Sequence, residues 1–269
     1  MESRDSFAGS FGSSRLDLAT KLGRNVPDGW WAVVYPSAGE AVVSFRRGQQ
    51  TDQRLGAAWN GAPEEAPVDR AVSEAVRRAR GHVRRYCAAN GLDRLATLTY
   101  RGSGCHDERR LRTDLGAFFR QLRRIAGSGP FAYLWVAEWH PGGHGLHAHF
   151  AVGRYIDKRL IERTWERGFV EIRRINADLR YASTLARARV AAAYLGKYVA
   201  KAFEANGGLH RYEVAQGFQP ERWRFFAETK EDAVNLCVDL RHGAMPTFRA
   251  SDEWEGWQGP PTLWMQWPE

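Results

Sequence analysis

The chain has little cysteine and no long hydrophobic run. Only three of its 269 residues are cysteines, Cys87, Cys105 and Cys237, and they are far apart. They offer neither a disulfide framework nor a paired CxxC zinc site, which predicts a protein of a reducing compartment. No run of about eighteen apolar residues and no apolar signal core occur in the sequence. We therefore expect a cytoplasmic protein without a membrane span.

The sequence also lacks a phosphate-binding loop of the form GxxxxGK[ST] and any internal repeat. The missing loop excludes a P-loop helicase within this sequence. With 43% hydrophobic residues, the 269 residues suffice for one large domain or two small ones.

What the chain does have is positive charge. Lysine and arginine number 39 against 31 aspartates and glutamates, so the formal charge is +8. Much of it lies in adjacent arginine pairs, whose planar side chains suit phosphate groups. These pairs include Arg77-Arg78, Arg84-Arg85, Arg109-Arg110, Arg123-Arg124 and Arg173-Arg174. The charge favours a nucleic-acid partner, although a solvated basic surface is the alternative.

Composition divides the chain into three parts. Residues 1–28 are rich in serine and glycine, which predicts a disordered tail. Residues 29–244 are expected to form one domain that begins with a hairpin of the runs WWAVVYP and AVVSFRR. Residues 245–269 hold four of the tryptophans among prolines and glycines. We expect this last part to be a tail that wraps the domain or meets a partner.

Hydrophobic periodicity predicts alternating strands and helices within the central part. Apolar residues at three- and four-residue steps indicate helices, and short β-branched or aromatic runs indicate strands. The expected helices are 69–90, 107–126, 157–168 and 184–204, and the expected strands are 94–100, 131–139, 146–153 and 169–175. This order predicts an α+β fold in which helices pack on an antiparallel sheet.

Two histidines in the run GLHAHF point to a metal site. On a strand, His147 and His149 project from the same face about 7 Å apart. Glu138, on the strand expected to pair with theirs, is the natural third ligand, and His140 and His144 in the turn are rivals. Two histidines and one acid leave coordination positions open for catalysis by Mg²⁺ or Mn²⁺, with Zn²⁺ as a further candidate. Alternatively, the histidines are structural.

Two tyrosines in the run AYLGKY suggest a nucleophile. Four residues apart on a helix, Tyr194 and Tyr198 share one face, together with Lys197 and Lys201. A tyrosine oxygen can attack a phosphodiester and keep the phosphoryl group as a covalent ester, with a cation nearby to lower its pKa or neutralise the phosphate. The alternative is two ordinary tyrosines at the margin of a core.

The runs ATLTY, EWHPGGHGLHAHF and YLGKYVAK together resemble, in this order, the three motifs of the HUH endonucleases that initiate rolling-circle replication of plasmids and single-stranded DNA phages. The tyrosines follow the histidines, unlike in the related conjugative relaxases. The spacing YxxxYxxK is similar to the two-tyrosine branch of the replication initiators. The resemblance covers about residues 94–204.

The resemblance implies a ferredoxin-like or RRM-like core and a site-specific single-stranded DNA endonuclease and strand transferase. It places a divalent metal at His147 and His149 with Glu138 as third ligand, and the nucleophiles at Tyr194 and Tyr198. Lys197 and Lys201 match lysines beside the family tyrosines. The implied substrate is single-stranded DNA at an origin hairpin. Because no phosphate loop is present, a host helicase is expected to unwind the origin.

Three other interpretations compete with a replication initiator. A single-strand transposase of the HUH superfamily is the nearest, and a noncatalytic basic DNA-binding regulator is the second. The third is a metal-dependent nuclease that uses water and needs neither tyrosine.

Contacts with DNA are expected along the helices 69–90 and 107–126. The candidate residues are Arg77, Arg84, Arg120 and Arg123, and binding through several phosphates should weaken steeply with salt. Trp135, Trp139 and Tyr100 are candidates for stacking on bases.

Overall fold

The structure is a computed structural model. It describes residues 27–48, 68–127, 129–173, 182–204, 212–255, 257 and 259–268. The chain divides into two compact units, each described here by itself. The described residues of unit 1 come from Met1–Ala62 and Glu221–Pro268, and those of unit 2 come from Pro63–Pro220.

Unit 2 is built on an antiparallel sheet with the strand order β6-β3-β5-β4-β7. Its strands are β3 (Arg94–Tyr100), β4 (Tyr133–Trp139), β5 (Leu146–Val152), β6 (Gly168–Arg173) and β7 (Tyr212–Val214). The central strands alternate large apolar residues with smaller or polar ones, so each strand presents a different surface to each face of the sheet.

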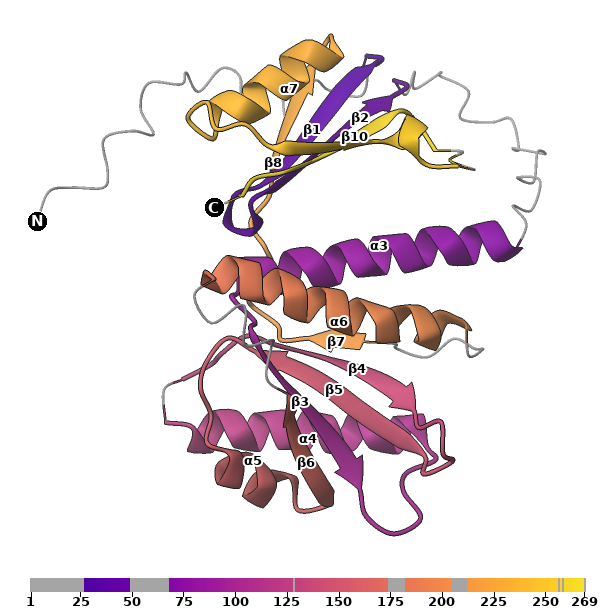
Figure 1. Ribbon diagram of the computed structural model, residues 1–269, viewed down its shortest axis with the longest axis vertical. Helices are drawn as coiled ribbons and strands as arrows, with labels where there is room; N and C mark the ends of the chain where they lie inside the picture. The colour runs from indigo at the N-terminus through magenta and orange to yellow at the C-terminus, as the bar shows by residue number, and fades with distance from the viewer. Residues whose placement is uncertain are drawn as a thin grey trace, which may run out of the picture. The chain divides into compact units, whose positions relative to one another are not determined.

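Helices cover both faces of this sheet (Figure 1). They are α3 (Val68–Ala89), α4 (Glu108–Ile125), α5 (Lys158–Trp165) and α6 (Thr184–Glu204). The helices α4 and α5 share one hydrophobic cluster with the sheet, which includes Phe118, Phe150 and Trp165. The helices α3 and α6 share another, which includes Val83 and Leu195. Unit 2 is therefore a three-layer sandwich.

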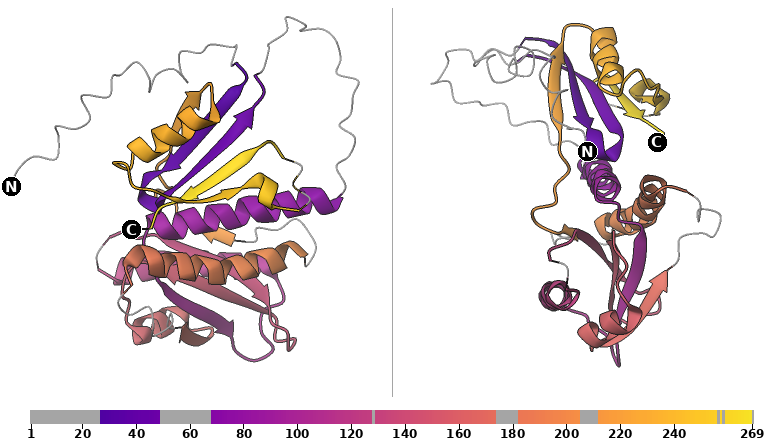
Figure 2. Two further views of the ribbon diagram at one scale, coloured as in Figure 1. Left: turned by 45° about the horizontal axis from the view of Figure 1, so that its top comes forward. Right: turned by 90° about the vertical axis from the view of Figure 1, so that its left-hand side faces the viewer.

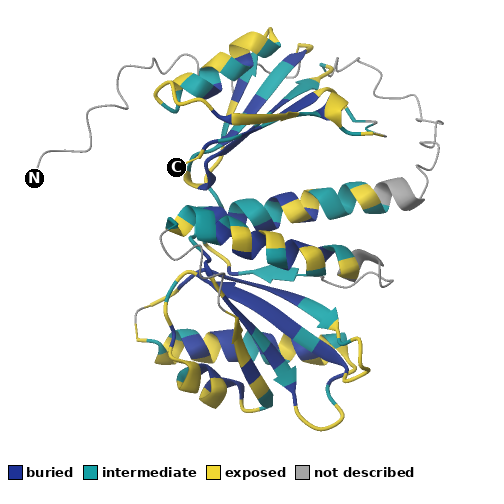
Figure 3. Cartoon of the chain, in the orientation of Figure 1, coloured by how far each residue is buried: buried dark blue, intermediate teal, exposed yellow. Residues whose placement is uncertain are grey.

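The expected fold class is confirmed by this arrangement, which is α+β and compatible with a ferredoxin-like core. The expected strand over residues 94–100 and the expected helix over 184–204 coincide with β3 and α6. Each buried stripe on the helices follows the predicted period, and the buried residues gather between the layers (Figure 3). Ile125 departs from the stripe predicted for α4, since it is 46% exposed at the helix end.

Unit 1 contains a second antiparallel sheet, of order β8-β1-β2-β10-β9, with one helix on it (Figure 2). Its strands are β1 (Gly29–Tyr35), β2 (Glu40–Arg46), β8 (Trp223–Ala227), β9 (Thr247–Ala250) and β10 (Thr262–Gln266). The helix is α7 (Lys230–Asp239), and short 3-10 turns lie at Pro36–Ala38 (η1) and Ser251–Glu253 (η3). Ala233 and Cys237 on α7 pack against Val34 and Val43 of the sheet.

This division differs from the expected boundaries. The predicted hairpin exists as β1 and β2, but it joins residues 221–268 in a separate unit instead of extending the domain expected over 29–244. The sequence predicts a tail over residues 245–269, whereas β10 pairs with β2 and β9 pairs with β10. Pairing between segments this far apart in sequence leaves no local signal. Most of the tail expected over 1–28 lies outside the described residues.

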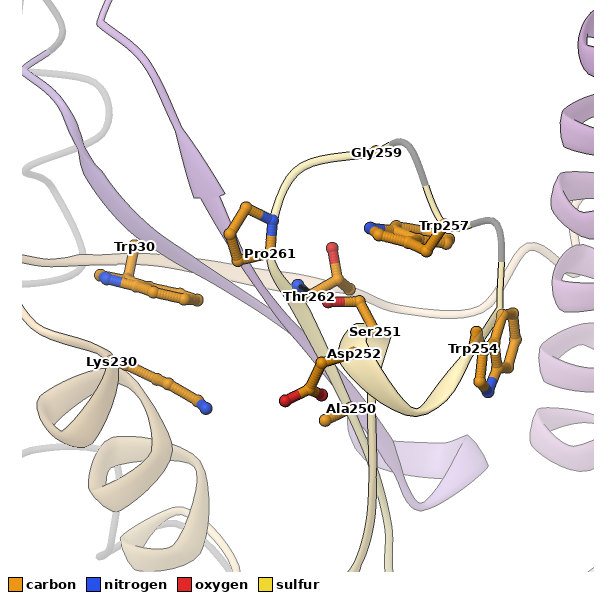
Figure 4. A pocket seen from close by; sticks show the side chains of 10 residues that line it. All are labelled: Trp30, Lys230, Ala250, Ser251, Asp252, Trp254, Trp257, Gly259, Pro261 and Thr262. Carbon is orange, nitrogen blue, oxygen red and sulfur yellow. Dashed lines mark hydrogen bonds between the residues drawn. The ribbon is translucent and has the colours of Figure 1, made fainter.

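A cavity of about 410 Å³ lies in unit 1. Trp30 and Lys230 line one side of it, and Trp254 and Trp257 line the other, with Asp252 between them (Figure 4). None of the residues predicted to act in catalysis or metal binding lines this cavity.

The cysteines will report on the two units separately. Cys237 lies in unit 1 and Cys87 in unit 2, and both are buried without any exposed surface. Burial raises the pKa of the Cys237 thiol to about 12 and raises that of Cys87 as well. Since the thiolate is the reactive form, both thiols should resist alkylation until their unit opens.

Mass spectrometry after pulse alkylation in increasing urea measures this protection. Cys105, also buried in unit 2, should become reactive together with Cys87. Fast labelling of any of the three thiols in the absence of urea would contradict the packing described here.

Candidate active site

The polar end of one sheet face gathers the predicted metal ligands. On β5, His147 lies opposite Glu138 of β4, and the same face continues into the apolar residues Leu134 and Val136 beneath α6. Strand alternation brings His149 to this face as well, as the sequence predicts. The β4–β5 hairpin is held in place at Gly145, where a Cβ atom would collide with the carbonyl group of Cys105.

A chain of hydrogen bonds ties the face together. Glu138 accepts hydrogen bonds through one carboxylate oxygen from His149 Nε2 at 2.8 Å and through the other from Lys201 Nζ at 2.8 Å. The other ring nitrogen of His149 lies 2.9 Å from the hydroxyl of Thr97. The predicted acid, one histidine and one lysine therefore form a single connected group.

The protonation of this group follows from burial and pairing. Burial alone would raise the pKa of Glu138, but the hydrogen bonds with Lys201 and His149 outweigh it, so the pKa lies below its ordinary value. Burial lowers the pKa of His149 more strongly than Glu138 raises it. The pKa of His147 is also lowered, first by burial and then by the neighbouring His140. Both imidazoles are therefore neutral at pH 7, the form in which a histidine binds metal.

The second histidine has an unused nitrogen. His147 Nδ1 lies 3.4 Å from the hydroxyl of Thr99, but Nε2 is buried, and no described group hydrogen-bonds to it. Buried polar atoms nearly always have a partner, so an unpaired ring nitrogen calls for an explanation. His140 stacks on His147 with ring centroids 4.5 Å apart, and His144 contacts His140. The predicted rival ligands thus border the site without satisfying Nε2.

These donors suit a divalent metal, although no group of three or more histidine, cysteine or acidic residues in the described part of the chain is already arranged to hold one. Two neutral imidazoles and a carboxylate are ligands that such ions accept. Thr97 and Thr99 stand behind the two rings, and a hydroxyl can accept the hydrogen bond that a metal-binding imidazole donates from its other nitrogen. The residues present therefore fit the group, with His149 exchanging its bond to Glu138.

The helix α6 brings both predicted tyrosines to this face. The ring of Tyr198 stacks on His149 with centroids 3.9 Å apart, and the ring of Tyr194 meets His149 edge-on at 6.0 Å. The Tyr198 hydroxyl donates a hydrogen bond to the Tyr194 oxygen at 2.6 Å. The helical spacing of four residues thus places the two phenols in direct contact beside the histidines.

The two phenols have different surroundings. Burial raises the pKa of Tyr198, and its hydrogen bond to Tyr194 raises it further. The ammonium of Lys201 lies 5.4 Å from the centre of the Tyr198 ring while it pairs with Glu138. Lys197 is exposed, and no described acid pairs with its ammonium group. Lys201 is therefore part of the connected group, and Lys197 is not.

Arg173 is a site residue that the sequence did not single out. It lies at the end of β6, its guanidinium sits 4.4 Å from the centre of the Tyr194 ring, and it donates a hydrogen bond to the Tyr194 oxygen at 3.4 Å. Sequence reasoning also misses Thr97 and Thr99, although β3 places them on the histidine face. Their alternation in RLATLTY, with the same period as the histidines, is the available signal.

The arginines predicted to bind DNA do not form one surface. Arg77 and Arg84 are half-buried on α3, the layer that shares its sheet face with the histidines. Arg120 and Arg123 lie on α4, which packs on the opposite face. Arg123 is moreover engaged with the protein, since it donates to the Phe131 carbonyl at 2.6 Å and packs over the Tyr133 ring.

Two of the aromatic residues predicted to stack on bases are part of the core. Trp135 is 3% exposed and Tyr100 is 7% exposed, whereas Trp139 is 42% exposed beside the hairpin turn. The prediction is therefore wrong for Trp135 and Tyr100, because both side chains point to the sheet face that α4 and α5 cover.

Comparison with known proteins bears on the segment that carries this site. No helix among the described residues has the length and apolar character needed to cross a membrane. No curated protein and no solved structure matches the chain significantly. The family model of the replication-associated protein ORF2 matches residues 93–203, which include both histidines and both tyrosines. Residues 93–203 are thus a domain of this replication-associated protein family, consistent with a rolling-circle Rep protein.

Proposed function

We propose that this protein nicks and rejoins single-stranded DNA at a rolling-circle origin. The reaction is a transesterification through a 5′-phosphotyrosine link, carried by Tyr194 and Tyr198. Single-stranded or hairpin origin DNA is the substrate, and a host helicase supplies the unwinding that the sequence has no phosphate loop to perform.

The observation that carries this proposal is the contact between the tyrosine pair and the histidine face. Tyr198 stacks on His149, which is hydrogen-bonded to Glu138, and Tyr198 is itself hydrogen-bonded to Tyr194. A nucleophile, a cation and a set of metal donors therefore meet within one small region. The match of this segment to a replication-associated family supports DNA as the partner.

The step makes one bond and breaks one. A tyrosine oxygen attacks the phosphorus, the new O–P bond forms, and the bond from phosphorus to the 3′ oxygen breaks. The phenol gives up its proton, and the released 3′ oxygen takes one up. No water is consumed, so the 3′ hydroxyl can later reverse the reaction and rejoin a strand.

Chain residues prepare this step. His147, His149 and Glu138 would hold Mg²⁺ or Mn²⁺, which supplies Lewis-acid polarisation of the scissile phosphate when bound. Lys201, whose ammonium lies by the Tyr198 ring, and Arg173, which donates to the Tyr194 oxygen, place positive charge where negative charge develops.

A covalent adduct is the first measurement. With Mn²⁺ and a labelled oligonucleotide containing origin sequence, the wild-type protein should shift the label to the mass of the protein on a denaturing gel. The variant Tyr194→Phe/Tyr198→Phe should give no adduct and no cleavage, because it keeps the rings but lacks both nucleophilic oxygens.

Two arms separate the alternatives. Chelation of the metal should remove both cleavage and adduct in the wild type. Cleavage that persists in the double variant would establish a water-using nuclease and overturn the proposal, and binding without cleavage under any metal would establish a DNA-binding regulator. As a matched control, Tyr155→Phe removes an exposed hydroxyl from the same unit and should leave the adduct unchanged.

A further inference from the structure

The sheet of unit 1 has one face covered by α7 and one face that α7 does not touch. Alternation sends Ala32 and Val34 of β1 towards α7, so Trp31 and Val33 point to the other face. On that face, strand pairing aligns one residue from each strand in a row across the whole sheet. The row is Arg224, Val33, Val42, Trp264 and Arg249.

This row, here called the cross-sheet strip, ends in an exposed arginine on each side. Four strand spacings of about 4.8 Å separate Arg224 on β8 from Arg249 on β9, or roughly 19 Å. Between them lie two valines and the half-buried Trp264. Positive charge thus brackets an apolar centre.

Aromatic rings border the strip. Trp31 and Phe226 are half-buried neighbours with ring centroids 5.6 Å apart. Trp254 stacks on Trp264 at 4.8 Å, and Trp257 meets Trp264 edge-on at 5.3 Å. The indole N–H of Trp31 is buried, and no described group accepts a hydrogen bond from it. This face therefore offers ring surfaces together with a spare donor.

The charges of unit 1 are segregated between the two sides of its sheet. The helix α7 carries Glu231, Asp232 and Asp239 against the single cation Lys230. Among the described strand residues on the strip's face, Glu40 is the one acid, and it is 3% exposed. The strip's side is therefore basic, although the unit as a whole holds many acids.

We propose that the cross-sheet strip is a second binding site for single-stranded DNA, with phosphates at Arg224 and Arg249 and bases against Trp31, Phe226 and Trp264. The assignment of DNA as partner rests on the proposed function. Aromatic rings on a sheet take about two to three unpaired bases, and flanking arginines neutralise the backbone. A duplex keeps its bases stacked inside and cannot use the rings, so single strands are favoured.

Salt dependence tests the strip. The variant Tyr194→Phe/Tyr198→Phe serves as background, so that covalent trapping cannot contribute, and a fluorescently labelled oligothymidylate is the probe. Each lost phosphate contact on a single strand should reduce the slope of log K against log salt by about 0.7. Arg224→Gln/Arg249→Gln should therefore flatten the slope by about 1.4 in fluorescence anisotropy titrations.

Arg241→Gln is the matched control, since Arg241 follows α7 and packs over Trp267 instead of lying on the strip. Its slope should be unchanged, and Arg249→Gln alone should lose about half of the effect. An equal loss in Arg241→Gln and Arg249→Gln, or no loss in the double variant, would overturn the strip. Circular dichroism verifies that each variant is folded.

Photo-crosslinking locates the bases directly. An oligonucleotide with 5-bromodeoxyuridine should crosslink to peptides that contain Trp31, Phe226 or Trp264. Crosslinks confined to unit 2 would contradict the proposal. Adduct formation by the wild type is a separate readout, so an active enzyme without strip crosslinks refutes the strip alone, and crosslinking without any adduct refutes the catalytic proposal alone.

Discussion

Tyr194→Phe will lower the yield of the first covalent protein–DNA adduct by more than about a thousandfold, whereas Tyr198→Phe will leave this adduct in place. The reason is the direction of the hydrogen bonds between the two phenols. The Tyr194 oxygen accepts from Tyr198 at 2.6 Å and from Arg173 at 3.4 Å. Two donors stabilise negative charge on Tyr194, while Tyr198 gives its proton to that bond.

The order of use follows from the same geometry. Tyr198 can attack only after its bond to Tyr194 is broken, which happens once Tyr194 carries the DNA strand. Tyr198→Phe should therefore allow the first cleavage and block the second exchange. A suicide substrate with a single nick site measures the first step, and a strand-transfer assay with two sites measures the second.

Arg173→Gln is the companion variant. Loss of one donor to a developing oxyanion costs about a hundredfold to a thousandfold in rate, so the first step should slow by about that much. Tyr198→Phe/Arg173→Gln should be slower still, because both donors to Tyr194 are gone. Equal first-step yields for Tyr194→Phe and Tyr198→Phe would show that the phenols are interchangeable and that this asymmetry has no role.

His147→Leu will abolish metal-stimulated cleavage, with a loss of at least about a thousandfold, because removing a ligand forfeits several kcal/mol of stabilisation of the transition state. The same variant should not destabilise the metal-free protein. In the wild type His147 Nε2 is buried without a described partner, and such a group costs about 1–3 kcal/mol. The unfolding free energy without metal should therefore stay level or rise.

Thermal unfolding with and without Mn²⁺ measures this pair of effects. Metal at a hundred times its dissociation constant stabilises a folded protein by about 2.7 kcal/mol, so the wild type should show a clear rise in Tm. That rise should vanish in His147→Leu. As a control, His242→Asn changes an exposed histidine of unit 1 whose positive φ asparagine tolerates. A rise in Tm that survives in His147→Leu would exclude His147 as a ligand.

Much of the candidate site could be predicted from the sequence because its geometry is local. A two-residue step on a strand and a four-residue step on a helix fix that His147 and His149 share one face and that Tyr194 and Tyr198 share another. The structure adds that these two faces meet, through the stacking of Tyr198 on His149. The roles of these residues in metal binding and catalysis stay predictions.

Contacts across elements were beyond the sequence. Arg173 reaches Tyr194 because β6 is an edge strand beside β3, and strand order is not visible in a hydrophobic pattern. The predicted arginine footprint failed to form one surface for a similar reason. The helical period shows that α3 and α4 each have an arginine face, but not that they lie on opposite sides of the sheet.

The sheet of unit 1 is assembled from segments at both ends of the numbering, and this has a consequence during translation. About 180 residues separate the end of β2 at Arg46 from the start of β8 at Trp223. At about 5–20 residues per second, the ribosome needs roughly 9–36 s to make them. The nascent β1–β2 hairpin must wait that long for its partners, while the replication-family domain is already emerging. A prematurely terminated chain would release that domain without the sheet of unit 1.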